Sequence, residues 1–424
     1  MNNRILMAIG LMCAALLLDG CAFNRLKKDL SKINALKPVS GTLINDAQSS
    51  SPVVVILWSL DDDSKNGTGY WVVHRDGSFK FLRPGGRYYL LAFEDSNEDL
   101  HYQETERAAA FGEPSIIDLD IDGNFEHLEL RLLPPGRVKI PESILNMSAE
   151  ARQAKFAARQ GQVSTVTTID DPVFNLDHAA LGLWEPLSFA EQLGVKVYFL
   201  EPYNPDKIPI LFVHGAVGYP GTWKEIIGSL DREKFQPWVV FYPSGLRLDM
   251  LADIYSKHID ELRLKHQFKD LIVVAHSMGG LVSRSMIQKY ARLESRCSIP
   301  LYITISTPWA GHSGAAMGVE HAPAVVPAWY DMTPGSSFIE GVFSTPLPPE
   351  TAYYLFFSYQ ADPGMKFGGE NSDGAVALSS ELFLQAQEES VRATGINDSH
   401  VGILSNTNTL RILNQIFDLY AHGE

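Results

Sequence analysis

A serine at the end of an apolar run is the first residue that could do chemistry. Residues 271–275 read Leu-Ile-Val-Val-Ala, and His-Ser-Met-Gly-Gly follows at 276–280 before a helical pattern begins. This is the nucleophile-elbow pattern Gly-x-Ser-x-Gly, with Ala275 in the first small position and Gly279 in the second. Small residues are needed there because the backbone is strained and the helix passes close to the strand. The pattern predicts that the hydroxyl of Ser277 stands clear of the sheet.

Two backbone amides could stabilise the negative charge that develops when such a serine attacks a carbonyl group. Met278 begins the predicted helix, where the helix dipole favours an anion. A second buried strand, 208–213, ends in a His-Gly-x-x-Gly motif at 214–218. At such a loop, the amide that follows His-Gly can point at an oxyanion. We therefore expect an oxyanion hole made by Ala216 and Met278, and we expect His214 to brace the loop.

An acidic run matches every fixed position of the EF-hand calcium loop, through Asp118, Asp120, Asp122 and Glu129. An EF-hand needs flanking helices, whereas apolar residues alternate with the acidic ones on both sides. This alternation predicts a hairpin that turns at 122–124 and points its acidic face at water. We therefore expect no metal and no cofactor, with calcium at these four residues as the alternative.

Composition limits the function classes. The chain has 424 residues, of which 45% are hydrophobic and 20% charged, which is enough for two cores. The formal net charge is −15 and no basic stripe is visible, so a nucleic-acid partner is not expected. Of the three cysteines, Cys13 and Cys21 lie near the N-terminus and Cys297 is alone, which excludes a disulfide framework in the mature domains.

The N-terminus has the features of a targeting segment. The apolar run 5–18 is too short to span a bilayer comfortably. Leu-Asp-Gly-Cys at 18–21 resembles the lipobox of bacterial lipoproteins, with Asp19 as the departure. The resemblance implies cleavage before Cys21 and acylation of that residue, and Ala22 in the next position implies the outer membrane of a Gram-negative cell. Acyl chains on Cys21 would hold the protein at the membrane. A plain secretory signal or an uncleaved anchor is the alternative.

From about residue 38 to residue 133, apolar and polar residues alternate with period two, and turn residues interrupt the pattern. This predicts an antiparallel β-sandwich. Residues 76–93 resemble the Ig-like, carboxypeptidase-regulatory type of β domain, which implies support or binding rather than catalysis. We predict a signal peptide (1–20), a tether (21–37), a β-sandwich domain (38–135), a helical connector (136–194) with a strong helix former at 149–159, and a catalytic domain (195–424).

From residue 195, strands alternate with helices, which is typical of a mostly parallel sheet covered on both faces. The predicted strands are 195–200, 208–213, 238–242, 271–275, 301–305 and 354–359. The predicted helices are 221–230, 248–268, 281–292, 380–389 and 401–419.

With both motifs in this order, the chain from about residue 181 onward resembles an α/β-hydrolase. Leu-Glu-Pro-Tyr at 200–203, Ile-Ser-Thr-Pro-Trp-Ala-Gly at 305–311 and Asp-Met-Thr-Pro-Gly-Ser at 331–336 are similar to bacterial lipases and GPI inositol-deacylase-like hydrolases. Trp309 replaces the usual histidine of the second element. The resemblance implies that 311–349, with its exposed-looking apolar residues, is a cap or lid lining an acyl pocket.

The resemblance also implies a catalytic triad in the order serine, acid, histidine. Ser-Asp-Gly-Ala-Val at 372–376 is similar to the acid-bearing loop and points to Asp373, with Asp362 as the alternative acid. His400 lies just before the last helix, where the superfamily places its histidine. His400 would take the proton of Ser277, and Asp373 would orient the imidazole.

We therefore expect a membrane-anchored serine hydrolase that cleaves acyl or lipid-like carboxylic esters through an acyl-enzyme. The substrate would be a small-molecule or lipid ester, and protein partners stay open. The alternatives are an amidase or peptidase on the same fold, and a non-catalytic lipoprotein that binds an envelope component. A triad indicates the type of reaction and not the substrate.

Overall fold

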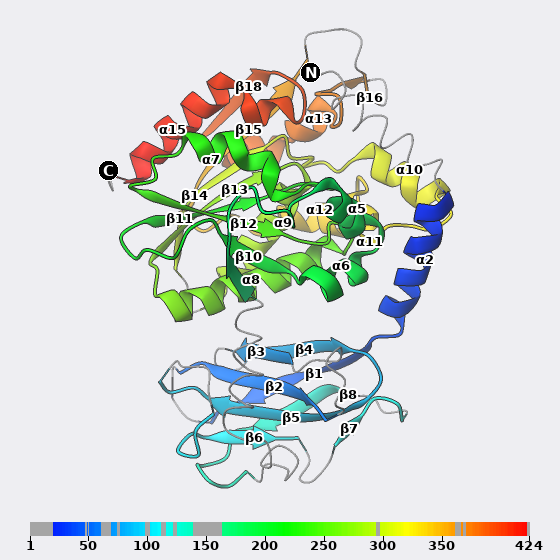
Figure 1. The fold of residues 1–424 in the computed structure, drawn as a ribbon, viewed down its shortest axis with the longest axis vertical. Helices are drawn as coiled ribbons and strands as arrows, with labels where there is room; N and C mark the ends of the chain where they lie inside the picture. Colours follow the sequence, from blue (N-terminus) through cyan, green and yellow to red (C-terminus); the bar gives the residue numbers. More distant parts are fainter. Residues whose placement is uncertain are drawn as a thin grey trace. The chain divides into compact units, whose positions relative to one another are not determined.

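The chain folds into two compact units, one formed by 1–30 with 162–424 and one formed by 31–161 (Figure 1). Residues 1–19 of the predicted signal peptide (1–20) and the predicted helix 149–159 lie outside the residues that the structure describes. None of the described helices is long and apolar enough to cross a membrane. This computed structural model describes residues 20–46, 49, 51–60, 69–73, 77–97, 102–111, 116–121, 125–138, 163–293, 297–360, 366–367 and 370–421.

The second unit is the predicted β-sandwich. Its two sheets have the orders β4-β1-β8 and β3-β2-β5-β6, with β7 paired to β5. The pairs are antiparallel except β1 with β8, which run parallel. Buried apolar side chains from both sheets form one core between them. The strands are β1 (Lys37–Ile44), β2 (Val53–Ser59), β3 (Gly69–Val73), β4 (Ser78–Arg83), β5 (Arg87–Glu94), β6 (Ala108–Ala110), β7 (Ile117–Asp118) and β8 (Phe125–Arg131).

The predicted acidic hairpin is wrong. Asp118 ends β7, which pairs with β5, whereas Glu129 lies in β8, which pairs with β1 in the other sheet. Alternation identified the two strands correctly but could not identify their partners. Leu119, which follows β7, and Leu130 of β8 are both buried in the core between the sheets. The two strands line this core from opposite sheets instead of pairing with each other. Asp122 lies outside the described residues, among which no group of three acidic, histidine or cysteine side chains could hold a metal.

The first unit is built on an eight-stranded sheet of order β18-β15-β14-β13-β11-β12-β10-β9. All neighbours run parallel except β10 with β12. This confirms the predicted mostly parallel α/β sheet. The edge strands β9 and β18 were not predicted. The strands are β9 (Ser164–Val166), β10 (Lys196–Phe199), β11 (Ile208–Val213), β12 (Phe235–Phe241), β13 (Asp270–His276), β14 (Ser298–Ile305), β15 (Ala352–Tyr359) and β18 (Arg392–Asn397).

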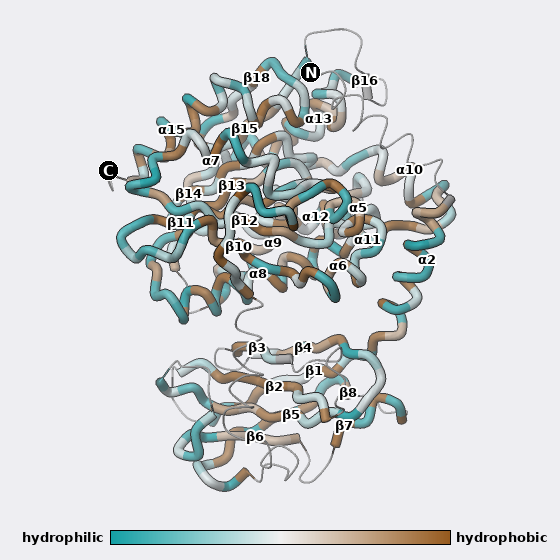
Figure 2. Tube along the Cα trace, viewed as in Figure 1, coloured by the Kyte–Doolittle hydropathy of each residue, from teal (hydrophilic) through white to brown (hydrophobic). Residues whose placement is uncertain are grey.

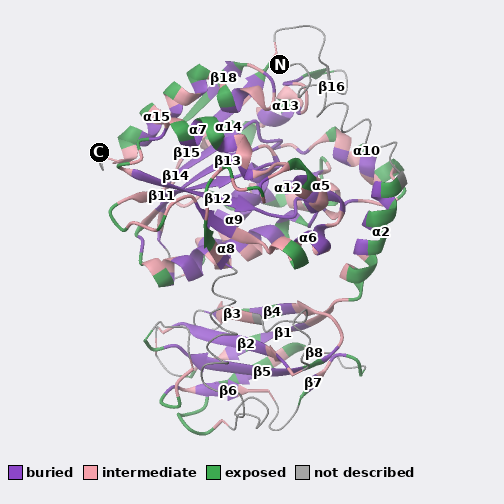
Figure 3. Cartoon of the chain, in the orientation of Figure 1, coloured by how far each residue is buried: buried purple, intermediate pink, exposed green. Residues whose placement is uncertain are grey.

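Helices cover both faces of this sheet (Figure 1). α8 packs with α9 on one face, and α7 packs with α15 on the other. The central strands are apolar along their length and almost entirely buried, as Figures 2 and 3 show, which is expected of parallel strands covered twice. The principal helices are α5 (Leu176–Trp184), α6 (Pro186–Leu193), α7 (Lys224–Ser229), α8 (Leu248–His266), α9 (Met278–Tyr290), α13 (Leu378–Glu381), α14 (Leu384–Glu389) and α15 (Thr407–Ala421).

The segment predicted as a tether contains a helix, α2 (Gly20–Asn34), whose first part packs onto the first unit. Phe23 is buried and meets the ring of Trp184 edge-on at 5.2 Å between centroids. Asp29 is also buried, and its carboxylate accepts hydrogen bonds from the amides of Leu187 and Ser188 at 2.8 and 3.1 Å. A carboxylate at those amides caps the start of α6 and complements its dipole. Residues 20–30 are therefore part of the first unit.

We predict that Asp29→Ala lowers the free energy of unfolding of the first unit by about 2 kcal/mol, because it leaves buried donors without an acceptor. Thermal unfolding followed by calorimetry measures this. Lys27→Ala is the matched control, since Lys27 is an exposed residue of the same helix. Equal melting temperatures for the two variants would show that α2 does not stabilise this unit.

Candidate active site

Ser277 lies at a sharp corner between β13 and α9. Its backbone has φ 55° and ψ −132°, a conformation that residues other than glycine adopt at a cost in energy. The corner is held by a hydrogen bond from the amide of Ser277 to the carbonyl of Ile305 at 2.8 Å, and by one from the amide of Gly280 to the carbonyl of Ser277 at 2.9 Å. The predicted strand, turn and helix are therefore present around the serine.

The two glycines after the corner are required by close packing. A Cβ atom on Gly279 would lie 2.4 Å from the carbonyl oxygen of Val213 and 2.5 Å from that of His214. A Cβ atom on Gly280 would lie 2.0 Å from the hydroxyl of Thr307. The first turn of α9 is thus pressed against the ends of β11 and β14, and only glycine permits this.

The predicted oxyanion loop lies directly against the serine. A Cβ atom on Gly215 would come within 2.7 Å of Cβ of Ser277 and 3.1 Å of its Oγ. The next residue, Ala216, is exposed, and Met278 is the first residue of α9. Among the described residues, neither amide has a hydrogen-bond acceptor, so both are available to a ligand. Their role as oxyanion donors stays a prediction.

His214 braces this loop. Its Nδ1 lies 2.8 Å from the carbonyl oxygen of Gly215, and its Nε2 accepts a hydrogen bond from the amide of Tyr242 at 3.4 Å. The imidazole stacks on the ring of Tyr242 with 4.1 Å between centroids. Burial lowers the pKa of His214 to about 4, so the ring is neutral and both nitrogens are occupied. This arrangement fits a bracing role rather than that of a base.

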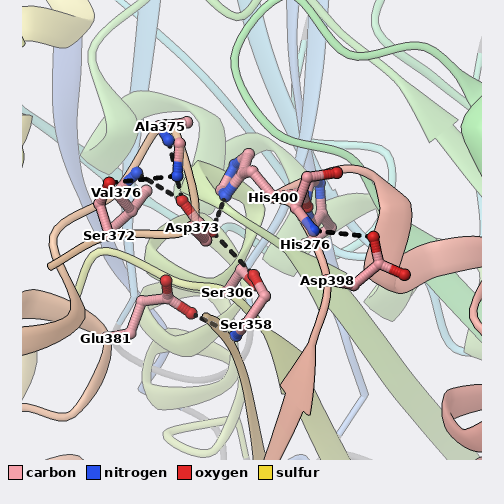
Figure 4. Close-up of polar contacts among 12 residues, drawn as sticks. His276, Ser306, Ser358, Ser372, Asp373, Ala375, Val376, Glu381, Asp398 and His400 are labelled. Atoms are coloured by element: carbon pink, nitrogen blue, oxygen red, sulfur yellow. Dashed lines mark hydrogen bonds and ion pairs between the residues drawn. The ribbon is translucent and has the colours of Figure 1, made fainter. Parts of the chain in front are cut away.

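Asp373 and His400 lie in contact (Figure 4). Nδ1 of His400 is 2.5 Å from Oδ2 of Asp373, and the amide of His400 donates to the carbonyl of Asp373 at 3.0 Å. The other carboxylate oxygen accepts from the amides of Ala375 and Val376 at 2.9 and 2.8 Å. Burial by itself would raise the pKa of Asp373, but His400 and these amides outweigh it and hold the pKa below its usual range. Asp373 is therefore an ionised, buried carboxylate.

His276 holds His400 beside the serine corner. Its Nε2 lies 2.8 Å from the carbonyl oxygen of His400, and the two rings are 4.7 Å apart between centroids (Figure 4). Burial, helped by the nearby His400, lowers the pKa of His276 to about 3. The neutral ring therefore donates from Nε2 and places the imidazole of His400 next to the residue that precedes Ser277. No role was predicted for His276; its position inside the serine motif was the available signal.

Asp362, the alternative acid, lies outside the described residues. Asp398 shapes the histidine loop, because its carboxylate accepts from the amide of Ser399 at 2.7 Å and from the side-chain amide of Asn406 at 2.9 Å. Among the described carboxylates, Asp373 is the one that bonds the imidazole of His400.

The predicted cap, 311–349, carries three short helices: α10 (Ser313–His321), α11 (Pro327–Met332) and α12 (Ser337–Val342). Asp331 fixes α11 to the start of α8. Its carboxylate is buried, bonds the guanidinium of Arg247 at 2.6 to 3.0 Å and accepts from the amide of Leu248 at 2.6 Å.

The five apolar residues of this segment that the sequence marks as exposed-looking are buried or half-buried, contrary to that expectation. Val326 is fully buried, whereas Val325, Trp329, Phe338 and Phe343 are half-buried. These side chains pack on the rest of the first unit; for example, the indole of Trp329 meets that of Trp184 in α5 edge-on, with 6.0 Å between ring centroids. Similarly, Trp309, which replaces the histidine of the resembled motif, is buried against Phe343.

Part of the first unit matches a known family of protein domains. The family described as PGAP1-like alpha/beta domain matches residues 248–318, which include Ser277. No curated protein matches the chain. Similar solved structures include the lin2722 product of Listeria innocua (14% identity, TM-score 0.38, covering 49% of this chain and 92% of that one) and the mature lipase BlEst2 of Bacillus licheniformis (17%, 0.41, 52% and 97%). Phospholipase PlaB of Legionella pneumophila is a third (15%, 0.34, 41% and 45%).

The order of the eight strands and the family match together identify the fold of the C-terminal unit. It is the α/β-hydrolase fold, so the unit of residues 1–30 and 162–424 is called the hydrolase unit hereafter. The sequence prediction of this fold is therefore confirmed, including its serine at the end of the central strand β13.

We predict that Gly279→Ala lowers the free energy of unfolding by about 1–3 kcal/mol, because the added methyl group overlaps two backbone carbonyls. Gly228→Ala is the control, since Gly228 lies in α7 with nothing within 4 Å of an added Cβ atom. That variant should be as stable as the parent or more stable by up to about 1 kcal/mol. Urea denaturation of both variants measures the difference, and equal stability would contradict the close packing of α9.

Proposed function

We propose that the chain is a membrane-anchored serine hydrolase that cleaves carboxylic esters through Ser277, His400 and Asp373. One observation carries the proposal: the bonded pair Asp373–His400 is held by His276 at the strained corner that presents the serine. Nucleophilic acyl transfer needs a serine nucleophile, a histidine that can accept its proton and a carboxylate that orients the histidine.

In the proposed cycle, His400 takes the hydroxyl proton as Ser277 attacks the ester carbonyl. The amides of Ala216 and Met278 stabilise the oxyanion of the tetrahedral intermediate. Collapse of the intermediate expels the alcohol, which receives the proton from His400, and leaves an acyl-enzyme. Water then attacks the acyl group with His400 as base, releasing the acid and restoring the serine. Asp373 keeps Nδ1 of His400 protonated and stabilises the imidazolium at each stage.

We infer an apolar acyl group in the substrate, as in lipid esters. The support is the cap, where Val325, Trp329, Phe338 and Phe343 pack on the rest of the unit but keep part of their apolar surface uncovered. Partly buried apolar surface of this kind suits an acyl chain better than a charged peptide.

We propose further that acylated Cys21 anchors the protein in the cell envelope, on the outer membrane because Ala22 follows. Cys21 is exposed at the start of α2, whereas Ala22 and Phe23 are buried. A lipid on Cys21 would therefore be attached to the hydrolase unit where the start of α2 packs on it.

We predict that Ser277→Ala abolishes labelling by a fluorophosphonate probe and lowers kcat on p-nitrophenyl esters by about 10⁴-fold or more, because the nucleophile is lost. Asp373→Asn should lower kcat by about 10⁴-fold, since the imidazole adopts the wrong tautomer. Asp362→Asn is the matched control and should stay near the parent activity.

The outcomes separate the alternatives. If the folded protein is not labelled by the fluorophosphonate probe, the serine-hydrolase hypothesis is rejected in favour of a binding lipoprotein. Loss of activity in Asp362→Asn but not in Asp373→Asn would reassign the acid. Faster turnover of matched anilides than of esters would indicate an amidase or peptidase, and a chain-length series of esters measures the size of the acyl group.

We predict that Cys21→Ser abolishes incorporation of an alkyne-labelled fatty acid and releases the protein from the membrane fraction, because each buried CH₂ of an acyl chain contributes about 0.8 kcal/mol to membrane binding. Cys297→Ala is the control and should keep the label, since Cys297 is buried in the hydrolase unit. Label that persists in Cys21→Ser would disprove the anchor, and cell fractionation reports the location.

A further inference from the structure

A second buried carboxyl group lies behind the Asp373–His400 pair (Figure 4). Glu381 ends α13, and only 1% of its surface is exposed. Its Oε2 accepts a hydrogen bond from the amide of Ser358 at 3.0 Å. Its other oxygen, Oε1, is buried and makes no hydrogen bond to the described residues. A buried acid in this position needs an explanation, because the proposed cycle uses one carboxylate.

Ser358 connects the two carboxyl groups. Its amide bonds Glu381, and its hydroxyl donates to Oδ2 of Asp373 at 2.8 Å. The hydroxyl of Ser306 lies 2.6 Å from that of Ser358. A serine hydroxyl has one proton, and Ser358 uses its proton on the carboxylate of Asp373. Ser306 must therefore donate to Ser358, which leaves Ser306 able only to accept from any further neighbour.

Burial and the neighbouring charge determine whether Glu381 carries a proton. Asp373 is the charged group that acts on Glu381 among the described residues, and it carries a negative charge. His276, His312 and His400 face Asp373 from β13, the cap and the histidine loop. Burial and then the charge of Asp373 raise the pKa of Glu381 well above its usual value. Two ionised carboxylates would repel each other in this dry site.

We propose that Glu381 is a positioning residue of the candidate active site: a neutral carboxylic acid that holds Ser358, and through it the carboxylate of Asp373, against His400. One oxygen accepts from the amide of Ser358, and the other carries a proton that faces Ser306 and Asp373. The site then contains a single negative charge opposite the imidazole. A second negative charge would stabilise the imidazolium and leave less of the neutral imidazole that acts as the base. The catalytic meaning of Glu381 rests on the proposed function; its protonation does not.

The first experiment compares Glu381→Ala with Glu381→Gln on p-nitrophenyl esters. We expect Glu381→Ala to lower kcat about 10- to 100-fold with little change in KM, because Asp373 and His400 lose their support. The amide of glutamine matches a neutral acid in shape and also donates, so Glu381→Gln should rescue most of kcat. Glu388→Gln on α14 is the control for an exposed glutamate.

The pH profile decides between a neutral and an ionised Glu381. The acid limb of kcat/KM reports the protonation of the base. If Glu381 is neutral, Glu381→Gln leaves this limb where it is. A limb that moves to lower pH in Glu381→Gln would show that a negative charge had been removed and would overturn the proposal. Full activity in Glu381→Ala would also overturn it.

A second experiment needs no substrate. The infrared difference spectrum of the parent against Glu381→Gln should contain the carbonyl band of a protonated carboxyl group at neutral pH, and a spectrum without that band would refute the proposal. If the protein hydrolyses no ester, titration of His400 by NMR replaces the kinetics: Glu381→Ala should shift it and Glu381→Gln should not. If the infrared band is present but the protein has no esterase activity, the proposed function is rejected and the protonation of Glu381 is still supported.

Discussion

The tight corner at Ser277 is the constraint on which the rest of the hydrolase unit depends. A positive φ at a residue other than glycine persists only where its surroundings enforce it. Here the enforcement is the contact of Gly279 with the end of β11 and of Gly280 with Thr307, which leaves no room for a side chain. The same contact aims the first amide of α9 and seats the loop of Gly215 beside the serine. This strained corner thus places the serine beside the loop of Gly215 and directly before the first residue of α9.

Charge around this corner is kept sparse by burial. His214 and His276 are neutral because desolvation lowers the pKa of each, whereas Asp373 is ionised because His400 and two amides stabilise its charge. Each neutral ring then works as a fixed dipole that orients a loop. Electrostatic interactions are strong in such dry surroundings, so groups oriented before the reaction need no reorganisation during it.

The first part of helix α2 belongs to the hydrolase unit, although it lies before the β-sandwich in the sequence. Residues 20–30 pack on α5 and α6, although residues 31–161, which form the β-sandwich, intervene in the sequence. Asp29 supplies the cap that Glu185, the residue before α6, does not provide with its own side chain. An anchor at Cys21 would therefore be tied to the hydrolase unit by a packed helix rather than by a flexible tether.

The sequence by itself determined the central strands, the serine corner and the acid and histidine candidates, because each is encoded by a short contiguous pattern. The tertiary structure alone decided that β18, whose residues are mostly exposed, joins the sheet edge, that β8 pairs with β1, and that α2 packs on α6. It also brought Ser306, Ser358 and Glu381 around Asp373 from separate segments. The physical reason is that hydrogen-bond partners and burial depend on which distant segments meet, and no local pattern of residues contains that information.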